Sequence, residues 1–117
     1  MKTIKLRAWD KKNGMTNSFC IQASSGFVSY KIYEWLSGDK KPVVMLYIGK
    51  NDKYGKEIYE GTILKDPQGN LGEVIYLAPS FAIRWKRKDG SWDTDTCFEY
   101  GTVIGNVYEH PRLMEAI

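Results

Sequence analysis

Cysteine and histidine are scarce in this sequence, which narrows the chemistry that it can support. It contains two cysteines, Cys20 and Cys97, and one histidine, His110. Because these residues cannot assemble a zinc site at any usual spacing, we expect no metal ion. A nucleophilic mechanism with a histidine base would depend on His110 alone, beside Pro111 near the end of the chain, so we expect no catalytic site of this kind.

Long apolar runs are absent as well. No run approaches the ~18 residues of a membrane-spanning helix, and residues 1–7 carry a charge at every second or third position. We therefore expect neither a membrane span nor a signal peptide. Without a secretion signal, Cys20 and Cys97 are expected to be two buried free thiols, with a disulfide between them as the less favoured alternative.

What is present fits a small globular protein rich in strands. The chain has 117 residues, of which 43% are apolar and 26% charged. This length predicts one domain over residues 1–117 with a core of its own. Aromatic residues reach 14% and there are 11 glycines. That combination favours strands and tight turns over a helical bundle.

The first half of the chain has one clear strand pattern. Over residues 3–9, Leu6 and Ala8 fall on one side and Arg7 and Trp9 on the other, which is the period of a strand. The polar residues 10–14 end in Asn-Gly and predict a turn. We expect three further elements: two short strands within residues 15–30, a short helix over 29–36 with Ser29 as its N-cap, and a buried strand over 43–48.

The second half has a regular series of short strands separated by turn signals. Asp66-Pro67-Gln68-Gly69-Asn70 and Lys88-Asp89-Gly90-Ser91 have the composition of turns. Gly61 and Gly72 occupy positions where a tight barrel corner needs a residue without a Cβ. The expected strands cover residues 62–65, 73–77, 81–86, 92–98 and 102–108.

Such spacing predicts a mainly β fold with a small SH3-like barrel or roll over residues 57–108. Residues 1–56 would form an N-terminal elaboration made of a strand and a short helix. Residues 109–117 would form a C-terminal tail with a last helical turn. Residues 1–56 carry 11 Lys/Arg and 4 Asp/Glu, whereas residues 57–117 carry 6 and 10. These opposite charges favour association between copies of the chain, and a homo-oligomer is therefore a hypothesis.

A basic cluster with two tryptophans is the one candidate binding site for nucleic acid. On the third barrel strand, cations alternate to one face and could neutralise phosphates, while a tryptophan stacks a base. Asp89, Asp93 and Asp95 follow at once, and pairing between these acids and the cations across the hairpin is the favoured interpretation. The candidate residues are Arg84, Trp85, Lys86, Arg87, Lys88 and Trp92.

Three motifs resemble a known family. They are Lys5-Leu6-Arg7-Ala8-Trp9-Asp10, the stretch from Met45-Leu46-Tyr47-Ile48-Gly49 to Tyr59-Glu60-Gly61, and Val103-Ile104-Gly105-Asn106-Val107-Tyr108-Glu109-His110-Pro111. Their order and content resemble the YopX-like proteins of bacteriophages and prophages. Thr62 departs from the family pattern, where Asp is usual. The resemblance implies an SH3-like β barrel in a cytoplasmic protein of phage origin, and it assigns no catalytic or binding residue.

The resulting hypothesis is a non-enzymatic module that binds a host or phage protein, such as a component of host defence. Exposed aromatic residues, for example Trp35, Trp92 or Tyr54, would serve as anchors. Nucleic-acid binding through the basic cluster is the alternative. We expect no enzyme and no cofactor, because the sequence has no nucleophile–base pair or cofactor motif. Gly49-Lys50 does not begin a phosphate loop, since Val44 and Asn51 replace the required residues.

Overall fold

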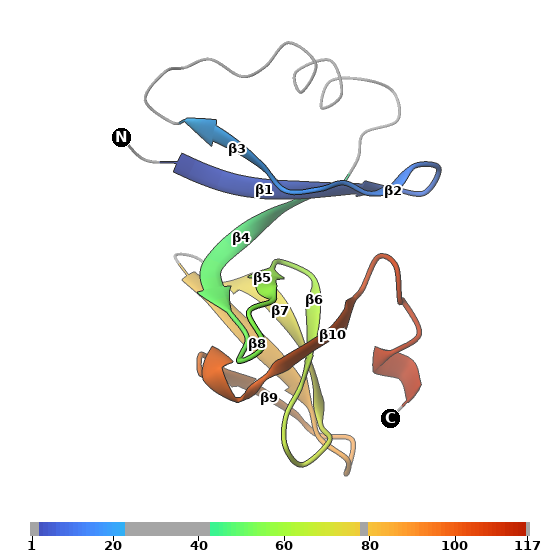
Figure 1. The fold of residues 1–117 in the computed structure, drawn as a ribbon. Coiled ribbons are helices and arrows are strands. Elements are labelled where there is room, and N and C mark those ends of the chain that lie inside the picture. Colours follow the sequence, from blue (N-terminus) through green and yellow to red (C-terminus); the bar gives the residue numbers. More distant parts are fainter. Residues whose placement is uncertain (1–2, 23–42, 78–79, 117) are drawn as a thin grey trace. The chain divides into compact units, whose positions relative to one another are not determined.

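A computed structural model describes residues 3–22, 43–77 and 80–116 of the chain (Figure 1). The fold is mainly β, as predicted, and the described part contains two short 3-10 helices, η1 (Phe98–Tyr100) and η2 (Met114–Ala116). The helix expected over 29–36 and the strand expected after Gly26 lie outside the described residues. The strands are β1 (Thr3–Asp10), β2 (Gly14–Met15), β3 (Phe19–Gln22), β4 (Val43–Asn51), β5 (Glu57–Tyr59), β6 (Thr62–Lys65), β7 (Leu71–Leu77), β8 (Ser80–Lys86), β9 (Trp92–Asp95) and β10 (Thr102–Asn106).

The chain divides into two compact units, an N-terminal unit over Met1–Tyr47 and a C-terminal unit over Ile48–Ile117. In the N-terminal unit, β1 pairs antiparallel with β2, β3 and β4. Leu6 and Ala8 are buried on one face of β1, as their spacing predicted. The turn after β1 is held by Asp10, whose carboxylate accepts hydrogen bonds from the backbone N–H groups of Lys12 and Asn13.

The C-terminal unit contains a five-stranded antiparallel sheet in the order β10-β6-β7-β8-β9, which curls into a half-barrel (Figure 1). Strands β6 to β9 pair in sequence order as antiparallel neighbours, and the two predicted turns connect β6 to β7 and β8 to β9. β10 returns to pair with the other side of β6, with a register shift between Val103 and Gly105. This arrangement is consistent with the small β barrel that the strand spacing predicted.

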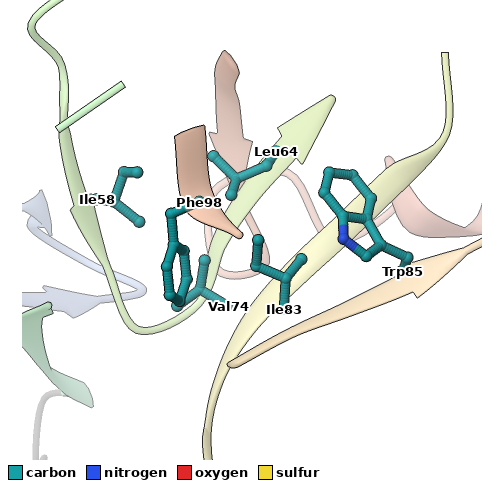
Figure 2. Packing of buried hydrophobic residues seen from close by; sticks show 6 residues of the cluster. All are labelled: Ile58, Leu64, Val74, Ile83, Trp85 and Phe98. Carbon is teal, nitrogen blue, oxygen red and sulfur yellow. The ribbon is translucent and has the colours of Figure 1, made fainter. Parts of the chain in front are cut away.

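Alternate residues of these strands build the core of the C-terminal unit. Val74, Ile83 and Trp85 point to one face of the sheet and pack with residues of β5, β6 and η1 (Figure 2). Gly72 lies opposite Trp85 on β7, where a Cβ would come within 2.5 Å of a methyl group of Ile83. Gly72 needs to lack a Cβ, as expected, but the reason is close packing inside β7 rather than a barrel corner. The buried cluster consists of Ile58, Leu64, Val74, Ile83, Trp85 and Phe98.

Two strands are shorter than predicted because side chains cap their ends. The strand expected over 92–98 ends at Asp95, whose carboxylate accepts hydrogen bonds from the N–H groups of Thr96 and Cys97. The strand expected over 102–108 ends at Asn106, whose side-chain oxygen accepts those of Tyr108 and Glu109. Short polar side chains compete with the strand ladder in this way.

The prediction of buried thiols is wrong in part. Cys20 and Cys97 are free, as expected, but both are exposed. Cys20 lies on β3, and Cys97 lies between β9 and η1. The alternation of apolar and polar residues did not reveal that both side chains face solvent. Among the described residues, no helix is long and apolar enough to cross a membrane.

Candidate functional site

The basic hairpin of β8 and β9 presents cations and an aromatic ring on its outer face. Lys86 lies opposite Trp92 in the strand register, and Arg84, opposite Thr94, is two residue pairs further along and so on the same face. The Arg84 guanidinium is 4.3 Å from the centre of the Trp92 ring, and the Lys86 amine is 5.8 Å from it. These cation–π contacts occupy part of a ring that is 46% exposed.

Trp85 belongs to the opposite face of the same strand. It is 3% exposed and forms part of the core, since successive side chains alternate across a strand. The six candidate residues are thus divided between two faces. Trp92, rather than Trp85, is the aromatic residue that accompanies the cations on the outer face.

Several of the candidate cations already have partners. The Arg87 guanidinium donates to Asp93 at 2.6 and 3.0 Å, which is the pairing across the hairpin that the sequence favoured. It also lies 3.5 Å from Asp66, which the sequence did not suggest. Lys86 donates to the backbone carbonyl of Met114 at 3.2 Å. Arg84 and Lys88 remain exposed on the surface.

A hollow of about 380 Å³ opens on the C-terminal unit beside this hairpin. One wall is the turn between β6 and β7, with Pro67 and Gln68. Trp85 of β8 and the paired Arg87 form another wall, and the residues around η1 complete the rim. The remaining lining residues are Asp66, Asp95, Cys97 and Tyr100. Two stretches of the chain, residues 66–68 and residues 85–100, therefore converge on one concavity.

The electrostatic character of the hollow is negative. Asp66, Asp93 and Asp95 surround the single positive charge of Arg87, whose pKa is raised by its hydrogen bonds to Asp93. The hydrogen bond from the Cys97 thiol to Asp95, and the charge of that carboxylate, raise the pKa of the thiol. Backbone hydrogen bonds from Cys97 and Thr96 lower the pKa of Asp95 against the effect of desolvation. Asp95 is therefore ionised at neutral pH.

Sequence reasoning did not identify this hollow. It named Trp35, Trp92 and Tyr54 as candidate anchors, of which Trp35 lies outside the described residues. Tyr54 is 69% exposed in the turn after β4, away from the hollow. Tyr100 is 66% exposed at the rim, whereas Phe98 in the same short helix is buried. The sequence Phe98-Glu99-Tyr100 does not indicate which of the two aromatic residues is exposed, so Tyr100 was missed. The alternation breaks where the 3-10 helix begins.

The residues of the central and closing motifs hold the fold together. Asp52 accepts hydrogen bonds from the N–H groups of Tyr54, Lys56 and Val103, each at 2.9 Å. Asn106 caps the end of β10 and donates to Glu109 at 2.8 Å. Gly61 adopts a φ of +80°, and Tyr108 packs against it. These contacts give the motifs a structural role.

No group of three His, Cys, Asp or Glu side chains among the described residues is arranged to hold a metal ion. A family model described as YopX protein matches residues 5–115, which is nearly the whole chain. No curated protein matches the chain.

Proposed function

The chain belongs to the YopX family, and we propose that it is a non-enzymatic interaction module that binds a partner protein through the hollow of its C-terminal unit. The partner is a bacterial host protein or a phage protein, a host defence component included, and binding takes place in the bacterial cytoplasm. The observation that carries the proposal is Tyr100, an aromatic side chain 66% exposed at the rim of a concave site. Tyrosine and tryptophan are enriched among the residues that dominate protein interfaces.

The arrangement of the rim supports this choice. The Tyr100 side chain makes no hydrogen bond, ion pair or ring contact with the described residues, so its exposure serves no visible structural purpose. Phe98, in the same 3-10 helix as Tyr100, packs in the buried core with Trp85. A tyrosine side chain has only two rotatable torsions, so it loses little conformational entropy on binding.

Photo-crosslinking at Tyr100 tests the proposal. A benzoylphenylalanine placed at position 100 is expected to capture a discrete protein from a lysate of the bacterium that carries the gene. Tyr54 is the matched control, since it has the same side chain and similar exposure but lies outside the hollow. Equal capture from both positions, or none from position 100, would contradict a specific site at the hollow.

Nucleic-acid binding is a second candidate, favoured by the shared face of Arg84, Lys86 and Trp92. Labelled DNA and RNA are titrated by anisotropy at about 50 and about 200 mM salt. Binding that weakens steeply with salt, and that is lost when Arg84 and Lys88 are changed to alanine, would support this candidate. Arg87 is left intact because its contacts with Asp66 and Asp93 connect the two turns.

A further inference from the structure

Three groups at the hollow have chemistry that the fold leaves unused. The first is the indole N–H of Trp85, which donates no hydrogen bond to the described residues although Trp85 is 3% exposed and lines the hollow. The indole nitrogen is not among the fully buried, unpartnered side-chain atoms of the described residues, so its N–H faces the solvent in the hollow. A ligand in the hollow can supply the acceptor.

The second group is the carboxylate of Asp95. It accepts hydrogen bonds from the backbone of Thr96 and Cys97 and from the Cys97 thiol. Within the described part of the chain it forms no ion pair, whereas Asp66 and Asp93 both contact Arg87. Its negative charge is therefore the one at the hollow that still lacks a cationic partner at contact distance.

The third group is the ring of Tyr100. It stands at the rim with its face available, and it lies on the same concavity as Asp95 and Trp85. Aromatic faces attract cations and pack against the aliphatic stem of a long basic side chain. An anion is disfavoured here, because two carboxylates, Asp66 and Asp95, line the hollow and its one guanidinium, that of Arg87, is already paired.

From these three groups we propose that the hollow binds an arginine residue in a peptide segment of the partner protein. The guanidinium pairs with Asp95 and lies against the Tyr100 ring, while the backbone carbonyl of the segment accepts the Trp85 N–H. Arginine is chosen over lysine because its planar fork suits both a carboxylate and an aromatic face. This inference rests on the proposed function, since it names the chemistry of the partner at the same site.

The test is a titration of the full chain with N-acetyl-arginine N-methylamide, followed by NMR at the assigned indole N–H of Trp85. The glutamine and glutamate analogues and inorganic phosphate are the comparison probes. We expect saturable shifts of the Trp85 and Tyr100 signals with the arginine probe, with weak affinity because the probe is small. Equal or stronger binding of the glutamine probe, the glutamate probe or phosphate would overturn the proposal, as would unchanged signals.

Matched variants refine the test. Asp95→Asn keeps a side-chain oxygen for Thr96 and Cys97 but removes the charge, and we expect the arginine probe to bind roughly two- to fivefold more weakly. Asp89→Asn is the control, because Asp89 is also a carboxylate that caps a backbone turn but does not line the hollow. Tyr100→Ala should weaken binding without unfolding the chain, since the side chain is exposed.

The two proposals can fail separately. If crosslinking at position 100 captures a protein but the arginine probe leaves the Trp85 signal unchanged, the chemistry assigned to the partner is wrong and protein binding stands. If neither experiment gives a signal at the hollow, the proposed function itself falls. Saturable arginine binding that both Asp95→Asn and Asp89→Asn weaken equally would show general charge attraction and would also overturn the inference.

Discussion

The carboxylate of Asp52 accepts a hydrogen bond from the backbone N–H of Val103, 2.9 Å away and 51 positions later in the chain. The same carboxylate accepts two further backbone hydrogen bonds, from Tyr54 and Lys56, in the turn that follows β4. One side chain thus shapes a local turn and ties it to β10. The position of Asp52 within the central motif of the family has a physical explanation in these contacts.

Replacing Asp52 with alanine removes the acceptor for three backbone N–H groups. We expect the free energy of unfolding to fall by about 2–4 kcal/mol, because at least some of these donors stay unsatisfied in a part-buried setting. Urea unfolding measures the change. Asp89→Ala, which affects an exposed cap within one turn, should cost much less. Similar losses for both variants would assign Asp52 no special role.

The pH dependence of stability should reveal the same contacts. Burial acts to raise the pKa of Asp52, but the hydrogen bonds from Val103, Lys56 and Tyr54 outweigh it and lower the pKa below its ordinary value. A pKa lowered in the folded state gives stability that is complete above the unfolded pKa of about 3.9 and is lost as pH falls through the lower folded value. The stability difference between wild type and Asp52→Ala should therefore shrink in acid, as unfolding at pH 7 and at pH values near and below about 4 can show.

Glu73 should behave in the opposite sense. Desolvation raises its pKa, and the charge of Arg84 offsets this only in part. Its stabilising contribution is present below the unfolded pKa of about 4.3 and is lost as pH rises through the folded value. Glu73→Gln should consequently match or exceed the wild-type melting temperature at neutral pH and gain less, or lose, in acid. A lower melting temperature at neutral pH would mean that the pairing with Arg84 outweighs desolvation.

Cys97 should react slowly with thiol reagents although it is exposed. Its hydrogen bond to Asp95, with the charge of that carboxylate, raises the pKa of the thiol, and the thiolate is the reactive form. In a Cys20→Ser background, Asp95→Asn should accelerate labelling of Cys97 several-fold at neutral pH, while Asp89→Asn should not. The rate is followed with a chromogenic disulfide reagent.

Gly72→Ala tests the packing of the core. The added Cβ would meet Ile83 at 2.5 Å and Trp85 at 2.7 Å, so we expect a loss of about 1–3 kcal/mol in the free energy of unfolding. Ile83→Ala in the same chain makes room for the new methyl group. The double variant should therefore be more stable than the sum of the two single losses predicts. If the two losses simply add, the destabilisation by Gly72→Ala does not come from the contact with Ile83.

Much of the β architecture could be predicted because its signals are local. Alternation placed Leu6 and Ala8 on one buried face, and Asn-Gly, Pro-Gln-Gly and Asp-Gly sequences marked turns that the structure contains. The end of β9 could not be predicted in the same way. The strand ends where the Asp95 side chain, rather than a neighbouring strand, accepts the next backbone N–H groups. A pattern of apolar and polar residues does not show which of these two acceptors the backbone will use.

The basic cluster shows the same limit at the level of function. Sequence spacing correctly separated Arg84 and Lys86 from Trp85 across the strand, and it suggested pairing with the acids that follow. It did not show that Asp66, 21 positions before Arg87, would join that pair, nor that Lys86 would reach the backbone of Met114. A cationic side chain is available to bind a nucleic acid only if the fold has not already paired it with an acid.

The sequence by itself determined the mainly β class, the family and the principal turns, since these follow from periodicity, turn chemistry and motifs within short stretches. Only the tertiary structure decided which groups stay available. It buried most of Trp85 but left it in the lining of a hollow, paired Arg87, and placed Tyr100 and the charge of Asp95 at the same hollow. The physical reason is that burial and ion pairing depend on distances through space, which are set only when separate stretches of the chain pack together.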